Sequence, residues 1–90
     1  QVPHYPIRRG AISLPPAERD AMFTKLDAAF AAMRLRVETI DGWRVPFEDG
    51  WFLVRLSGTE PKVRITAEAR TEARTKELYE LALSKVTAPS

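Results

Sequence analysis

Apolar residues recur every three or four positions in two stretches of the chain, and each stretch predicts a helix that packs against a core. The first stretch follows Pro15 and Pro16, which suit a helix start because the N–H that proline lacks has no partner there. It runs from about Pro16 to Met33. Its stripe consists of Met22, Leu26, Ala29 or Phe30, and Met33. The second stretch follows Thr71, a residue suited to capping a helix, and carries Leu78, Leu81, Ala82 and Val86.

Between the two predicted helices the pattern is typical of β-strands. The segments LRVETI, WRVPF and WFLVRL are separated by turn residues, and residues 62–69 alternate between apolar and polar side chains. Asp41-Gly42 predicts a tight hairpin, and Glu48-Asp49-Gly50 predicts a second turn. Residues 1–14 predict an extended lead-in or hinge, with a possible edge strand in YPIRRGAI. We therefore expect an α+β domain over residues 15–90, with an antiparallel sheet of about four strands and both helices on one face.

The composition limits the classes of function. A chain of 90 residues builds one domain with one core, and the absence of cysteine excludes disulfides and zinc–thiolate sites. We expect a cytoplasmic protein, because no apolar run approaches the roughly 20 residues that span a membrane and residues 1–10 lack the apolar core of a signal peptide. The net charge is +2, and the charged residues are interspersed rather than gathered in the stripe that is typical of nucleic-acid binders.

Arginine accounts for ten of the 14 basic residues, and its guanidinium binds phosphate or carboxylate bidentately. Arg8 and Arg9 stand next to each other in the lead-in. They could form a hinge contact, a second phosphate-facing pair or a solvated sheet edge, and we expect the solvated edge.

The segment RLSGTEPKVR, residues 55–64, is the clearest candidate for a binding site. A hairpin connection needs about two to five residues and no pair of arginines. If the flanking strands are neighbours, Arg55 and Arg64 flank the mouth of the loop. Ser57 and Thr59 supply hydroxyls, and Gly58 permits the positive φ that turns successive N–H groups toward one point. This set suits a tetrahedral phosphate, but a long polar loop with solvated arginines is an equal alternative from the residues alone.

The longer run RLSGTEPKVRITAEA resembles the phosphate-binding signature of the α-D-phosphohexomutase superfamily, R-x-S-G-T-E-P-x-x-R. The preceding DGWRVPFEDGWFLVR is similar to the run that comes before this signature in the superfamily, which includes phosphoglucomutase, phosphomannomutase and phosphoglucosamine mutase. The resemblance implies the C-terminal domain of a four-domain enzyme, with a TATA-binding-protein-like fold. In such an enzyme the loop holds the phosphate that is not reacting while a phosphoryl group moves between the 1- and 6-positions of a hexose.

Carried over to this sequence, the phosphate contacts would be Arg55, Ser57, Gly58, Thr59 and Arg64. Glu60 matches the signature, but a carboxylate does not suit a dianion, so we expect it to pair with an arginine or to cap the loop.

The resemblance also implies what this chain lacks. The phosphorylated serine, the Mg²⁺-binding aspartates and the sugar-selecting loop would lie in the other three domains, so we expect no catalytic residue, metal site or cofactor in these 90 residues. The expected partners are a hexose phosphate, bound through its phosphate, and those three domains. Two rival hypotheses are a free-standing basic module that binds nucleic acid on its sheet, and a purely structural or dimerising domain.

Overall fold

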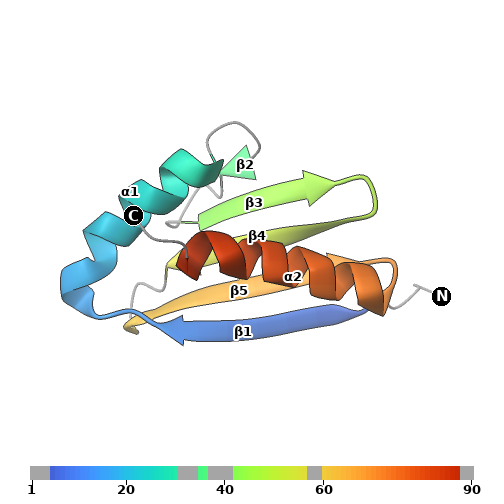
Figure 1. Cartoon of the computed structure of the whole chain (residues 1–90), viewed down its shortest axis with the longest axis horizontal. Coiled ribbons are helices and arrows are strands. Elements are labelled where there is room, and N and C mark those ends of the chain that lie inside the picture. The colour runs from blue at the N-terminus through green and yellow to red at the C-terminus, as the bar shows by residue number, and fades with distance from the viewer. Residues whose placement is uncertain (1–4, 31–34, 37–41, 57–59, 88–90) are drawn as a thin grey trace.

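The computed structural model describes residues 5–30, 35–36, 42–56 and 60–87 (Figure 1). Its elements follow in the order β1 (Ile7–Ser13), the 3₁₀ turn η1 (Pro16–Glu18), α1 (Arg19–Phe30), β2 (Leu35–Arg36), β3 (Gly42–Phe47), β4 (Gly50–Leu56), β5 (Lys62–Ala69) and α2 (Glu72–Thr87). This arrangement confirms the predicted α+β class.

The strands form one five-stranded sheet in the order β1-β5-β4-β3-β2. Each described pair of neighbours is antiparallel. β1 comes from the N-terminal segment and lies at one edge, where it pairs with β5 from Ile7↔Glu68 to Ser13↔Lys62. The two-residue β2 lies at the other edge. The sheet therefore places β4 and β5, which flank the signature loop, side by side and away from both edges.

Both helices pack on the same face of the sheet (Figure 1). The residues of α2 that face the sheet are Leu78, Ala82 and Val86, and all three are buried. From α1, Leu26 and Phe30 are buried, and the Phe30 ring lies 6.2 Å from Trp43 and 5.6 Å from Phe52, centroid to centroid. The strands supply the rest of this core through alternate residues: Val45, Phe52, Val54, Leu56, Val63, Ile65, Ala67 and Ala69. The remaining strand residues point to the opposite face, which no described helix covers.

The two helices begin close to where the sequence predicts. The backbone N–H of Arg74 donates to Thr71 Oγ1 over 3.1 Å, which confirms Thr71 as the cap of α2. The residues from Pro16 form a single 3₁₀ turn, and α1 follows it from Arg19. Ala29 is exposed, so Phe30 is the member of the predicted stripe that faces the core. Met33 lies outside the described residues.

The tight hairpin predicted at Asp41-Gly42 is wrong, whereas the second predicted turn is confirmed. The register pairs Arg36 with Trp43, but a two-residue turn at 41–42 would bring Ile40 opposite Trp43. Gly42 is instead the first residue of β3 and pairs with Arg55, because the ladder between β3 and β4 extends that far. Asp41 lies outside the described residues. The second connection is a two-residue turn over residues 48–49 that joins the pair Phe47↔Gly50.

Candidate functional site

Arg55 and Arg64 lie directly opposite each other on β4 and β5. Their sequence neighbours Val54, Leu56 and Val63 are fully buried, so the alternation of the strands directs both arginines to the face that the helices leave uncovered. Both side chains are exposed. Residues opposed in this way have Cβ atoms about 4.5–5.5 Å apart, so the two arginine side chains leave the sheet side by side, at the end where the signature loop begins.

Ser57, Gly58 and Thr59 lie outside the described residues, so their expected hydroxyl and amide contacts stay predictions. The exit of the loop is described. Its backbone is tied to the rest of the fold where the Leu14 N–H donates to the Pro61 carbonyl over 2.6 Å. The backbone therefore anchors the segment just before Arg64 to the end of β1.

Glu60 pairs with Arg64, one of the two roles expected of it. The Arg64 guanidinium donates to Glu60 Oε1, and Lys62 Nζ lies 3.9 Å from Glu60 Oε2. The hydrogen bond and charge of Arg64, followed by the charge of Lys62, lower the pKa of the Glu60 carboxyl below its usual 4.5. Like charges placed directly opposite each other on a sheet are destabilising, so this carboxylate offsets part of the repulsion between Arg55 and Arg64.

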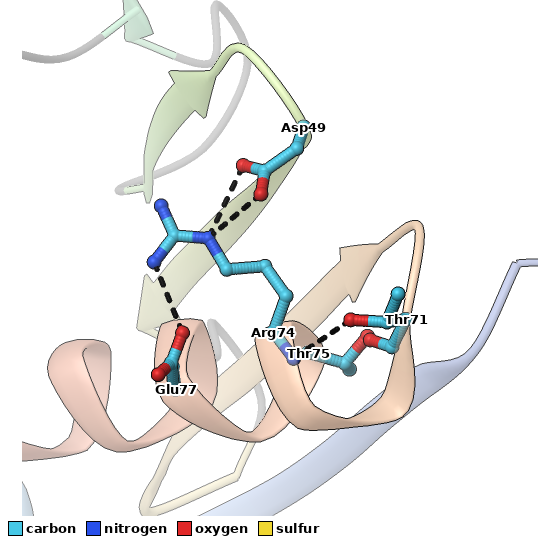
Figure 2. Close-up of polar contacts among 5 residues, drawn as sticks. All are labelled: Asp49, Thr71, Arg74, Thr75 and Glu77. Atoms are coloured by element: carbon cyan, nitrogen blue, oxygen red, sulfur yellow. Dashed lines mark hydrogen bonds and ion pairs between the residues drawn. The ribbon is translucent and has the colours of Figure 1, made fainter.

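A second polar cluster lies at the other end of β4 (Figure 2). The Nε–H of Arg74 donates to both carboxylate oxygens of Asp49, over 3.1 and 3.0 Å, and Nη1 donates to Glu77 over 3.4 Å. The guanidinium carbon also lies 5.4 Å from the centroid of the Phe47 ring. This cluster ties the β3–β4 turn to the first turn of α2. The cations and carboxylates in it are already paired with one another, so we assign it a structural role.

The sequence indicated Asp49 as a turn former, but it gave no signal of the contact with Arg74. The two residues are 25 positions apart and meet only once the sheet and α2 are assembled. The Asp49 carboxylate raises the pKa of Arg74 above its ordinary value, through a hydrogen bond and through its negative charge.

The described part of the chain contains no candidate metal site. No group of three or more His, Cys, Asp or Glu side chains gathers there in a way that could hold an ion. Among the described helices, none is both long and apolar enough to cross a membrane.

The sequence profile described as "Phosphoglucomutase/phosphomannomutase, C-terminal domain" matches residues 14–83. A "Probable phosphoglucosamine mutase" of Methanocella arvoryzae is 40% identical over 85 residues, which cover 94% of this chain and 19% of that protein. A "Phosphopentomutase" of Thermococcus kodakarensis is 40% identical over 93 residues, covering 97% of this chain and 20% of that protein.

Among solved structures, a phosphoglucomutase/phosphomannomutase family protein from Burkholderia thailandensis superposes with a TM-score of 0.60 at 29% identity. The match covers 98% of this chain and 19% of that one. The chain thus spans about a fifth of the length of the relatives that it matches.

Proposed function

Because this chain belongs to the phosphoglucomutase/phosphomannomutase C-terminal domain family, we propose that it is the phosphate-holding domain of a longer sugar-phosphate mutase. In this proposal residues 55–64 bind the phosphate that is not reacting, while the rest of the protein moves a phosphoryl group between the 1- and 6-positions of a hexose. The relative named phosphopentomutase indicates that the family also includes a protein named for a five-carbon sugar. A domain that recognises the phosphate alone fits such a range of sugars.

The observation that carries the proposal is the pairing of Arg55 with Arg64 across β4 and β5. Two guanidinium forks side by side match the oxygens of a phosphate monoester, and charge-assisted hydrogen bonds of this kind are among the strongest in proteins. Glu60 carries one negative charge and bonds to Arg64. A phosphate dianion carries about twice that charge and can contact both arginines at once, so we expect it to be the better partner for the pair.

Phosphate recognition at a distance from the reacting atoms serves catalysis by positioning. Binding energy from a non-reacting part of a substrate holds the reacting oxygen in place, and this lowers the barrier without any chemistry at the remote site. A substrate with a phosphate at either end presents the same group to Arg55 and Arg64 in both orientations. The pair can therefore serve both halves of a reaction in which a bisphosphorylated intermediate turns around.

No step of this proposal is assigned to a metal ion. The resemblance implies Mg²⁺ in the parent enzyme, but the described residues contain no ligand cluster that fits it. The residues of this chain are proposed to bind and orient, and none is proposed to transfer the phosphoryl group.

The proposal is tested in the full-length protein by replacing each arginine with glutamine. Loss of one charge-assisted hydrogen bond costs about 1.5–3 kcal/mol, so Arg55→Gln and Arg64→Gln should each lower kcat/KM for the hexose phosphate by about 10- to 100-fold. Inhibition by inorganic phosphate should weaken in parallel. Lys76→Gln is the matched control, because Lys76 is an exposed cation on α2, across the sheet from the pair. Arginine variants that fold normally and turn over at the control rate would refute the proposal.

A further inference from the structure

Four arginines cross the uncovered face of the sheet, one on each of four neighbouring strands. They are Arg9 on β1, Arg64 on β5, Arg55 on β4 and Arg44 on β3, and we call them the arginine band. Arg9 pairs with Thr66, two residues from Arg64 on the same side of β5. Diagonal neighbours of this kind lie roughly 7–8 Å apart, so Arg9 is one diagonal step from Arg64 and is set back from the loop.

The other end of the band follows from the register between β3 and β4. Arg44 pairs with Leu53, two residues from Arg55, which makes Arg44 and Arg55 diagonal neighbours as well. The Arg44 guanidinium carbon lies 5.1 Å from the centroid of the Trp51 ring. Along β4, Trp51 lies farther from the signature loop than Leu53 and Arg55 do. Because the Arg44 guanidinium lies over Trp51, it points away from Arg55 and does not contact it.

The charges on this face are strongly unbalanced, although the whole chain has a net charge of only +2. Lys62 shares the face and pairs with Ser13, which adds a fifth cation beside the loop. Among the described strand residues that the register places on this face, Glu68 is the one carboxylate. Glu60, at the rim, is already engaged with Arg64 and Lys62. By contrast, the exposed side of α2 carries three carboxylates of its own: Glu72, Glu77 and Glu80.

We propose that the arginine band is an electrostatic approach surface for the anion site, on which Arg9 and Arg44 draw a phosphorylated ligand toward Arg55 and Arg64. The proposal rests on the proposed function of Arg55 and Arg64. A surface lined by one sign of charge raises the local concentration of an oppositely charged ligand, and a dianion responds to each arginine with twice the energy of a monoanion. Arg9 and Arg44 therefore act through the field that they produce at the site, without contact in the bound complex.

The same face is less suited to a single strand of nucleic acid, the rival ligand. Proteins that bind single strands stack bases on open aromatic rings. Trp51 is half-buried, and the guanidinium of Arg44 lies over its ring. Ile7, Leu53 and Thr66, which share the face with the band, offer no ring for stacking. The exposed ring of Tyr5 lies away from the signature loop, where it lines a hollow with Arg44 and Trp51. A small anion needs only the charges, and these are the feature that the face supplies.

The test compares two double variants of the full-length protein that remove the same net charge. Arg9→Gln with Arg44→Gln weakens the band, whereas Lys76→Gln with Lys85→Gln removes two cations of α2, which packs on the opposite face of the sheet. The substrate is whichever of glucose, mannose or glucosamine 6-phosphate the protein turns over fastest. A unit charge about 10 Å from a dianion in water, screened at 50 mM salt, changes binding by roughly twofold. We therefore expect the band variant to lose about threefold or more in kcat/KM at 50 mM salt, with kcat unchanged, and less than about 1.5-fold at 0.5 M salt.

Three results would overturn the inference. An equal loss in the control variant would mean that only net charge matters. A loss that persists at 0.5 M salt, or that falls on kcat, would mean that Arg9 or Arg44 contacts the substrate directly. Binding of a single-stranded RNA oligonucleotide that the band variant abolishes, with kcat/KM unchanged, would assign the face to nucleic acid. Arg55→Gln, measured in parallel, separates the two proposals: if it leaves kcat/KM intact, the proposed function itself fails.

Discussion

Gly50→Ala tests the register of β4 and β5, on which the placement of Arg55 opposite Arg64 depends. A Cβ atom at Gly50 would lie 2.4 Å from the Glu68 carbonyl oxygen, 2.8 Å from Ala69 Cβ and 2.9 Å from Ala69 Cα. Two of these atoms belong to the backbone of β5, and Gly50 pairs with Ala69 in the ladder, so the strands would have to separate there. Overpacking of this kind costs about 1–3 kcal/mol, and alanine returns about 0.4–1 kcal/mol by restricting the unfolded chain. The net expectation is a loss of about 1–2 kcal/mol in the free energy of unfolding.

The assay is urea unfolding followed by circular dichroism, together with a thermal scan. A loss of this size should lower Tm by about 5–10 °C in a domain of this length. Gly42→Ala is the matched control, because a Cβ there would meet its nearest atom, the Val54 carbonyl oxygen, at an ordinary 3.4 Å. We expect the control to be neutral or slightly stabilising. If Gly50→Ala matches wild type in both midpoint and slope, β4 and β5 do not approach as described, and the opposition of the two arginines loses its basis.

Three further predictions concern the polar contacts. Thr71→Ala should lower the free energy of unfolding by about 1 kcal/mol, because α2 loses its cap, whereas Thr71→Ser should retain most of it in the same urea assay. Asp49→Asn should lower Tm modestly at low salt and hardly at all at 1 M salt, since the pair with Arg74 is partly exposed; a salt-independent loss would contradict the ion-pair account. In an NMR titration the pKa of Glu60 should lie below 4.5 and rise toward it in Arg64→Gln. Because folding lowers this pKa, the stabilisation by Glu60 is present above the unfolded pKa and is lost as pH falls through the folded value; an unchanged pKa in the variant would show that Arg64 is not its partner.

The strands around the site were predictable because their patterns are local. The alternation over residues 62–69 gave both the strand and the orientation of Arg64, since Val63 and Ile65 must turn toward the core. Thr71 could likewise be predicted as the cap of α2, because its hydroxyl oxygen accepts a hydrogen bond from a backbone N–H only three residues along the chain. The segment RLSGTEPKVR stood out as a candidate binding site by its density of donors, but the residues alone left a solvated polar loop as an equal alternative.

Other features depended on contacts between distant segments, which no local pattern encodes. Asp41-Gly42 has the composition of a tight turn. Gly42 is nevertheless the first residue of β3, because it pairs with Arg55 in the ladder between β3 and β4. The arginine band required the strand order as well as the strands. Arg9 and Arg64 are far apart in sequence and become neighbours only because β1 pairs with β5.

The central claim, that Arg55 and Arg64 hold a substrate phosphate together, is tested most directly by observing their guanidinium groups. The full-length protein would be labelled with ¹⁵N-arginine, and the Nε–Hε resonances followed by NMR during titration with glucose 6-phosphate and, separately, with inorganic phosphate. The account predicts saturable shifts of both resonances with one common dissociation constant, and the loss of both responses when either arginine is replaced by glutamine. Unshifted Arg55 and Arg64 resonances in a protein that still turns over its sugar phosphate would contradict it.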